Sequence, residues 1–450
     1  MGITVIGAGL AGCEAAWAAA QQGIPVTLWE MKPEKYTPAH HSPRFAELVC
    51  SNSLKAKRLE SAAGLLKEEM RRLGSLCVPV ALDCAVPAGG ALAVDREAFS
   101  AAVTEKICAH PLITVKQGEV TEIPTDGVTV IATGPLTAQP LADAIATLCG
   151  GGLSFYDAAA PIVTAESVDM TSAFRASRYD REESGEGDYI NCPLNKEEYE
   201  AFREALVSAE RAPLHEFDRV EGLTVYEGCM PIEVLASRGG DAIRFGPMKP
   251  VGLRDPHTGH RPWAVVQLRA ENAAGTLYNL VGFQTNLKFS EQKRVFGMIP
   301  ALKNAEFMRY GVMHRNTFLN APTLLDGAFR LKSRPQLLFA GQMTGVEGYM
   351  ESAASGLLAG LNAARQVKGQ PPLILPRDTM LGALSAHVSE ENANYQPMGA
   401  NFGILPTLDT HVRDKKQRYA ALAQRALDSL MQVIAGMPED LPAVAENKEE

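Results

Sequence analysis

Ile3-Thr4-Val5-Ile6-Gly7-Ala8-Gly9-Leu10-Ala11-Gly12 is the stretch that decides the fold of this chain. An apolar, β-branched run leads directly into the pattern G-x-G-x-x-G, and a helical pattern follows from Glu14 to Gln22. In such a unit Gly7 makes the tight turn, Gly9 lets backbone approach a pyrophosphate, and Gly12 lets the helix pack on the strand. The stretch therefore predicts a strand–turn–helix unit that binds a dinucleotide.

A second short strand, Pro25 to Trp29, ends at Glu30. Glu30 lies 18 residues (30 − 12) after Gly12, near the spacing of an acid that binds ribose hydroxyls. The first N–H groups of the helix after the glycine turn are available to phosphates. The alternative is a glycine-rich turn in an ordinary α/β unit. The pattern alone fits FAD or NAD, and its position at the start of the sequence favours FAD.

Two later segments continue the nucleotide-binding pattern. Gly127 to Gly134 is a β-branched strand that ends in Ala-Thr-Gly, and Leu337 to Gly345 is an apolar strand followed by a glycine turn. A helix of small residues is predicted after it, from Tyr349 to Gly356. The candidate cofactor-binding residues are thus Gly7, Ala8, Gly9, Leu10, Ala11, Gly12, Glu30 and Gly341.

The predicted fold class is α/β, with a Rossmann-like FAD-binding domain, an inserted α+β domain and a C-terminal helical tail. At 450 residues the chain is long enough for two or three domains. We expect the FAD-binding domain to comprise residues 1–134 and 326–373. Residues 135–325, where short strands such as 243–245 alternate with Pro and Gly turns, form the insertion. Residues 374–450 form the helical tail, with one amphipathic helix over Lys415 to Ile434.

Composition excludes several classes. The 46% hydrophobic content is enough for a packed core, and no apolar stretch is long enough to span a bilayer. The N-terminus lacks the basic region of a signal peptide. The eight cysteines form no C-x-x-C pair, so we expect neither a metal site nor a disulfide framework. A cytoplasmic protein is predicted.

The net charge of −9 argues against non-specific coating of nucleic acid, but it leaves room for a local basic face. Basic residues gather between Arg44 and Arg72, and again at Arg413, Lys415, Lys416 and Arg418. Each group is either a solvated helix face or a set of contacts to phosphate.

Two cysteines lie in contexts that suit chemistry. Cys50 follows a His-His-Ser-Pro loop, and we expect a basic helix after it, over residues 56–74, with Asn52 or Ser53 as its cap. A helix N-terminus activates a thiol. Cys229 lies between Gly228 and a turn marked by Pro231. The alternative for both cysteines is a residue without a chemical role.

Six blocks occur in order along the chain: 7–12, 45–56, 226–233, 245–252, 281–287 and 340–356. Together they resemble the folate- and FAD-dependent tRNA (uracil-5-)-methyltransferases of bacteria, over essentially the whole chain. A larger relative, which builds carboxymethylaminomethyl groups on wobble uridine, shares the fold but has a longer chain.

This resemblance implies a function. In the family, 5,10-methylenetetrahydrofolate supplies the one-carbon unit, reduced FAD supplies the reducing equivalents and is re-reduced by NAD(P)H, and the product is 5-methyluridine in the T loop of tRNA. The resemblance makes Cys50 and Cys229 the catalytic residues: Cys229 adds to C6 of uracil, and Cys50 lies beside the flavin. The base has to leave the RNA stack. Arg413, Lys415 and Lys416 then become candidate RNA-binding residues.

Three other functions stay open on sequence alone. They are a plain FAD oxidoreductase that acts on a small metabolite, a methylase of the same family that acts on ribosomal RNA, and a flavin-containing scaffold that binds RNA without chemistry.

Overall fold

The structure is a computed structural model, and it describes residues 2–150, 153–158, 160–180, 187–212, 230–311, 313–392 and 395–437. Its first sheet has six strands in the order β16-β17-β7-β1-β2-β6, in which β16 is antiparallel and the others are parallel. These strands are β1 (Ile3–Ile6), β2 (Val26–Glu30), β6 (Ile113–Gln117), β7 (Val128–Ile131), β16 (Arg330–Leu331) and β17 (Arg334–Phe339).

Helices α1 (Leu10–Gln21) and α11 (Tyr349–Val367) pack closely against each other beside this sheet. Glycines make the contact possible, because a Cβ at Gly356 would lie 2.1 Å from the carbonyl oxygen of Ala11, and one at Gly360 would lie 2.4 Å from that of Ala15. The sequence pattern predicts the start of the first helix at Glu14, whereas α1 begins four residues earlier, at Leu10. We call the part of the molecule built around this sheet the first half; it also contains α4 (Arg96–Ala109), α5 (Gln139–Cys149) and α10 (Ala321–Leu324), among further helices given below.

A small three-stranded sheet lies between β2 and β6 in the sequence, formed by β3 (Ser53–Ala56), β4 (Ala85–Val86) and β5 (Ala91–Val94). Two helices accompany it, α2 (Ala62–Arg72) and α3 (Cys77–Asp83). The helix expected over 56–74 is therefore too long at its start. Ser61 caps α2 by accepting a hydrogen bond from the N–H of Gly64 at 3.1 Å, so the helix begins only after this residue.

The second large sheet is antiparallel throughout, with the order β10-β11-β12-β13-β9-β14. Its strands are β9 (Ile162–Thr164), β10 (Phe174–Arg175), β11 (Tyr189–Leu194), β12 (Ala264–Ala270), β13 (Leu277–Leu280) and β14 (Phe307–Arg309). Its helices are α6 (Lys196–Ser208), α7 (Ile232–Ser237), α8 (Ala242–Phe245) and α9 (Phe289–Phe296). It has a hydrophobic core of its own, which includes Phe202, Phe283 and Phe296.

One expected strand in this half is wrong. Residues 243–245 lie in α8, where the N–H of Phe245 donates to the carbonyl oxygen of Asp241 at 2.9 Å and closes a helical turn. A run of three apolar and basic residues has no periodicity that distinguishes a strand from one helical turn.

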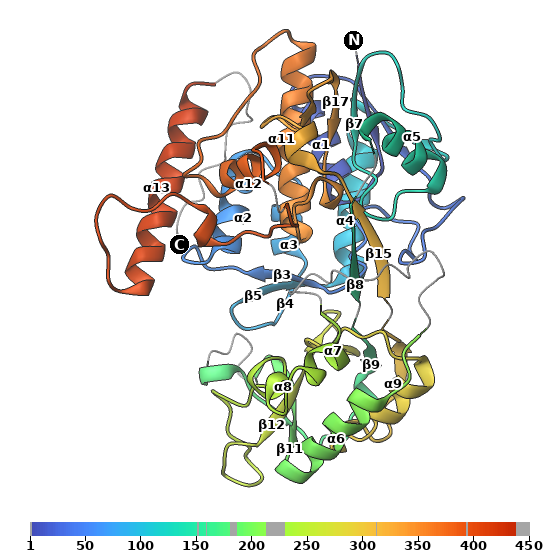
Figure 1. The fold of residues 1–450 in the computed structure, drawn as a ribbon, viewed down its shortest axis with the longest axis vertical. Coiled ribbons are helices and arrows are strands. Elements are labelled where there is room, and N and C mark those ends of the chain that lie inside the picture. Colours follow the sequence, from blue (N-terminus) through green and yellow to red (C-terminus); the bar gives the residue numbers. More distant parts are fainter. Residues whose placement is uncertain are drawn as a thin grey trace.

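Two strands connect the halves. β8 (Leu153–Ala158) and β15 (Met313–Phe318) pair antiparallel, and they run between the parallel sheet above and the antiparallel sheet below (Figure 1). The first core includes Leu141, which precedes β8 in the sequence, and Leu319, which directly follows β15, so the chain crosses between the halves along this ribbon. The boundaries at 134/135 and 325/326 stay predictions.

The C-terminal region packs on the first half through α12 (Met380–Ser389) and α13 (Lys415–Ala435). The buried face of α13, which includes Leu422, Ala426 and Leu430, belongs to the same core as the parallel sheet. Residues 445–450 lie outside the described residues. No helix in the described part of the chain is both long and apolar enough to cross a membrane.

Candidate functional site

An open cleft with about 1400 Å³ of empty space, part of it continuous with solvent, lies at the carboxyl ends of the parallel strands. Its walls come from the glycine turn after β1, the end of β2 at Glu30, residues 118–120, residues 132–138 and the pair Gly341–Gln342. Parallel strands bring these distant segments to one edge, which is where open α/β sheets bind their ligands.

The three glycines of the opening turn have the different surroundings that the sequence predicts. Gly7 has φ +96°, and a Cβ there would lie 2.7 Å from the carbonyl oxygen of Ala132. A Cβ at Gly12 would lie 1.7 Å from the carbonyl oxygen of Gly7. At Gly9 a Cβ would meet nothing within 4 Å. Gly9 thus faces open space in the cleft, as expected of the position where a ligand approaches the backbone.

Glu30 closes this turn from the neighbouring strand. Its carboxylate is buried and accepts a hydrogen bond from the N–H of Ala8 at 2.8 Å and another from the N–H of Lys32 at 2.9 Å. It also lines the cleft. The carboxylate therefore positions the glycine turn, and its binding to ribose stays a prediction.

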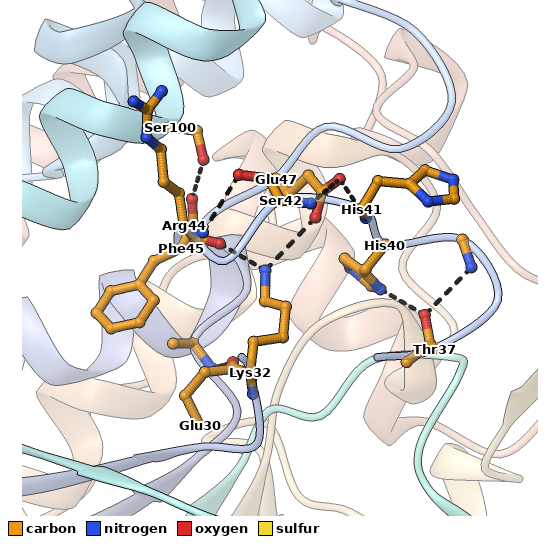
Figure 2. Close-up of polar contacts among 12 residues, drawn as sticks. Glu30, Lys32, Thr37, His40, His41, Ser42, Arg44, Phe45, Glu47 and Ser100 are labelled. Atoms are coloured by element: carbon orange, nitrogen blue, oxygen red, sulfur yellow. Dashed lines mark hydrogen bonds and ion pairs between the residues drawn. The ribbon is translucent and has the colours of Figure 1, made fainter. Parts of the chain in front are cut away.

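The loop after β2 forms a polar wall that the sequence analysis missed. Lys32 Nζ donates to the carbonyl oxygen of Arg44 at 2.5 Å and pairs with Glu47 at 3.5 Å (Figure 2). Glu47 in turn accepts from the N–H of His41 at 2.9 Å. The carboxylate thereby ties together the loop that holds His40, whose pKa is lowered by burial. The His-His-Ser-Pro motif was the only sequence signal for this wall.

Cys50 lies in the same cleft as the glycine turn. Its turn is anchored to the first residue of α11, because Tyr349 Oη accepts hydrogen bonds from the N–H of Cys50 at 2.6 Å and from that of Ser51 at 3.2 Å. The strand β3 follows Cys50, so the expected helix N-terminus is absent here. Asn52 is not a cap either, since its side chain donates to the carbonyl oxygens of Val94 and Ala270 at 3.0 and 2.8 Å.

Three arginines hold the segment around Cys50, and the sequence analysis missed all of them. Arg96, on α4, donates to the carbonyl oxygens of Leu48 and Cys50 at 2.5 and 3.3 Å. Arg309, on β14, donates to that of Val49 at 2.5 Å. Arg269, on β12, donates to Ser51 Oγ at 2.8 Å and to Asn52 Oδ1 at 2.9 Å.

Arg269 and Arg309 belong to the antiparallel sheet, so the second half of the molecule forms hydrogen bonds directly with the segment around Cys50. The same cations make its surroundings electropositive. Burial lowers the pKa of Arg269 and of Arg309. The ion pair of Arg96 with Glu271, at 2.5 Å, links α4 to the residue after β12.

Gly341 closes the cleft from the side of β17. It has φ +84°, and its N–H donates to Ser355 Oγ at 2.7 Å. A Cβ on Gly341 would lie 3.2 Å from the side chain of Ala11. The turn at Gly341 thus leads into α11 next to the glycine turn of β1, as the sequence predicts.

Cys229 lies outside the described residues, but the chain directly after it is described. The N–H of Ile232 donates to the carbonyl oxygen of Gln284 at 2.7 Å. The buried carboxylate of Glu233 accepts from Thr285 Oγ1 and from the N–H of Asn286, both at 2.8 Å, and burial raises its pKa. The sequence block 281–287 therefore fixes the residues that follow Cys229.

Arg413, Lys415 and Lys416 lie exposed around the first turn of α13, which Asp414 caps by accepting from the N–H of Gln417 at 2.8 Å. None of the three forms an ion pair with a described residue. Cations at a helix N-terminus oppose the helix dipole. Their position therefore suits binding of phosphate better than it suits helix stability. Of the group between Arg44 and Arg72, Lys67 is buried and donates to the carbonyl oxygen of Leu54 at 2.7 Å.

The parallel sheet with its glycine turn and the antiparallel second sheet define an α/β protein with a dinucleotide-binding type of fold. The family model described as glucose inhibited division protein A matches residues 2–371. Two solved structures of Aquifex aeolicus GidA share this fold, with TM-scores of 0.70 and 0.71 at 16% and 18% identity. Each covers 98% of this chain, which spans 74% and 76% of the GidA chains.

Curated relatives narrow the class. The methylenetetrahydrofolate--tRNA-(uracil-5-)-methyltransferase TrmFO of Enterococcus faecalis is 58% identical over 437 residues, which is 97% of this chain and 99% of the relative. TrmFO of Geotalea uraniireducens is 60% identical over 430 residues, or 95% and 97%. The chain therefore belongs to the family of methylenetetrahydrofolate--tRNA-(uracil-5-)-methyltransferases.

Among the described residues no group of three His, Cys, Asp or Glu side chains is placed to hold a metal ion.

Proposed function

We propose that this chain methylates C5 of a uridine in the T loop of tRNA, with 5,10-methylenetetrahydrofolate as the one-carbon donor and with FAD that is reduced by NAD(P)H. The observation that carries the proposal is that Cys50 opens into the same cleft as Gly9 and Gly341. A thiol and a dinucleotide site thus share one cavity in a chain of this family.

The residues of the cleft fit FAD. Open space at Gly9 and the N-terminus of α1 suit a pyrophosphate, and the buried Glu30 suits a ribose. The turn at Gly341 and the start of α11 would then lie at the flavin end, close to Cys50. When bound, the flavin supplies the hydride that reduces the transferred methylene to methyl.

The proposed roles of the two cysteines follow from the low reactivity of the uracil ring. C5 of uracil is a poor nucleophile, and a thiolate that adds to C6 turns C5 into a carbanion equivalent. We assign this addition to Cys229, which follows Gly228 and precedes the fixed start of α7. Cys50, which Tyr349 and the three arginines hold at the cleft, assists the transfer on the cofactor side.

The RNA has to be held while the base is extruded, which costs a few kcal/mol. Arg413, Lys415 and Lys416 provide exposed positive charge on α13 for contacts to phosphate. Such contacts position the RNA without reading its sequence.

The direct test uses a tRNA transcript with labelled methylenetetrahydrofolate, FAD and NADPH. We expect the label to appear as 5-methyluridine after nuclease digestion, and to be absent when NADPH is omitted. NADPH oxidation without labelled RNA would support a plain oxidoreductase. A parallel reaction contains ribosomal RNA in place of the tRNA transcript. Label in ribosomal RNA alone would support a methylase of the same family that acts on ribosomal RNA. RNA binding without label would support a scaffold.

A further inference from the structure

Three aromatic rings form a parallel stack on the second half, outside the cleft. The rings of Phe307 and Tyr310 lie 5.3 Å apart at 13°, and those of Tyr310 and Phe289 lie 4.8 Å apart at 14°. The inner end rests on the core residue Phe296, at 6.4 Å from Phe307. The outer end is the ring of Phe289, which is 54% exposed. An exposed ring at the end of an ordered stack presents a flat apolar face to solvent.

A buried glutamine holds this stack in place. Gln292 Nε2 donates to the carbonyl oxygens of Leu287 and Gly311, both at 2.7 Å, and its Oε1 accepts from the N–H of Gly311 at 2.8 Å. Gln292 lies one helical turn after Phe289 on α9, and Gly311 directly follows Tyr310. The two outer rings are therefore fixed to each other, so a ligand that stacks on Phe289 meets a preorganised surface.

Residues next to the stack in sequence contact Val49, which precedes Cys50, and the described residues on both sides of the segment 213–229, which includes Cys229. Arg309, which precedes Tyr310, donates to the carbonyl oxygen of Val49, the residue before Cys50. On the other side, Leu287 forms a bridge with Arg211, and Gln284 accepts from the N–H of Ile232. The described residues on both sides of 213–229 therefore contact the residues that lead into Phe289.

None of the three rings lines the dinucleotide cleft. A folate that passes its methylene to a flavin in that cleft has to lie inside it, so its pteridine is not the natural occupant of this surface. Positive charge accompanies the outer ring. Lys293 lies four residues after Phe289 on the same face of α9, is exposed, and forms no ion pair with the described residues.

We propose that the ring of Phe289, backed by Tyr310 and Phe307, is a stacking platform for an unpaired base next to the target uridine, with Lys293 at the adjacent phosphate. The inference rests on the proposed function, since it takes RNA as the substrate. Extruding one base unstacks its neighbours, and aromatic side chains replace such lost stacking for any base.

The test compares variants of Phe289 in the full chain loaded with flavin. Phe289→Ala removes the ring, Phe289→Leu keeps an apolar side chain without a π face, and Phe289→Trp keeps a stacking surface. Met298→Ala is the control, because Met298 is another exposed apolar residue (37%) just after α9. Binding is measured on T-arm transcripts with 2-aminopurine beside the target position, whose fluorescence falls when it stacks. KM for tRNA and KM for folate are measured alongside.

We expect Phe289→Ala and Phe289→Leu to weaken RNA binding about 5- to 150-fold, the range for loss of one base–aromatic stack, and to abolish the quenching. Phe289→Trp and Met298→Ala should bind like the wild type. Unchanged affinity and quenching in Phe289→Ala, with a wild type that methylates the transcript, would overturn the platform alone. A raised KM for folate with unchanged RNA binding would overturn it in favour of the pteridine. A wild type that binds no RNA would overturn both the platform and the proposed function.

Discussion

Tyr349 Oη accepts a hydrogen bond from the backbone N–H of Cys50 at 2.6 Å, although the two residues are 299 positions apart. The same oxygen accepts from the N–H of Ser51, which leaves the phenol hydrogen available to a further acceptor. Burial raises the pKa of Tyr349, so the phenol keeps this hydrogen at neutral pH. The first residue of α11, which also lines the cleft, therefore holds Cys50 together with the three arginines.

Tyr349→Phe should uncouple Cys50 from α11. Two backbone N–H groups lose their acceptor, so we expect a loss of about 1–3 kcal/mol in the free energy of unfolding and at least a tenfold lower kcat for methylation. Tyr395→Phe is the matched control. Tyr395 is also buried, but its hydroxyl donates to the carbonyl oxygen of Thr344 at 2.6 Å. A Tyr349→Phe enzyme with wild-type kcat would show that the turn holds Cys50 without the phenol.

Gly9→Val should empty the cofactor site without unfolding the chain. A Cβ at Gly9 meets nothing within 4 Å, so the side chain occupies only the space we assign to the pyrophosphate. Gly240→Val, at an exposed glycine that is equally open, is the control. Flavin absorbance after gel filtration is the measurement. Full absorbance in Gly9→Val would contradict the cofactor placement.

Gly12→Val should behave differently from Gly9→Val. A Cβ at Gly12 would lie 1.7 Å from the carbonyl oxygen of Gly7, so β1 and α1 have to separate. We expect a lower melting temperature in the absence of flavin, measured by circular dichroism, whereas Gly9→Val should melt like the wild type. Equal melting of all three proteins would show that the turn adjusts to the added side chain.

Reversing the charge of Arg413, Lys415 and Lys416 to Glu should weaken tRNA binding. The slope of log affinity against log salt should fall by about 2–3, because fewer counterions are released. Acidic residues in the first turn of α13 favour the helix, so misfolding does not explain a loss. Lys106→Glu, on the exposed surface of α4, is the control for a single charge reversal away from α13, to be compared with Lys415→Glu alone. Unaltered affinity at low salt would leave the three residues as a solvated helix face.

The two cysteines should fail in different ways. Cys229→Ala should keep FAD and NADPH oxidation but lose methylation, and it should lose the covalent complex with tRNA that contains 5-fluorouridine, because that analogue traps a thioether at C6. Cys50→Ala should stop methylation and, since Cys50 lines the cleft, shift the flavin spectrum. Electrophoresis of the adduct and absorbance are the measurements. An adduct that survives in Cys229→Ala and is lost in Cys50→Ala would reverse the two roles.

Much of the first half was predictable because its signals are local. The run from Ile3 to Gly12 encodes a strand, a turn with φ > 0 at Gly7 and a close helix contact at Gly12 within ten residues. The amphipathic pattern over Lys415 to Ile434 likewise predicted α13, which in the structure begins at Lys415 and ends one residue later, at Ala435. Short segments were harder: 243–245 forms one helical turn, and the helix after Cys50 begins only at Ala62.

The sequence by itself determined the dinucleotide unit and drew attention to Cys50, because glycines, an acid and a reactive residue type can be read at fixed spacings. Only the tertiary structure decided what surrounds Cys50: the phenol of Tyr349 and the guanidinium groups of Arg96, Arg269 and Arg309. It also decided that Phe289, Tyr310 and Phe307 form one stack. These contacts depend on how the two sheets pack against one turn. No local period in the chain encodes which distant side chains that packing brings together.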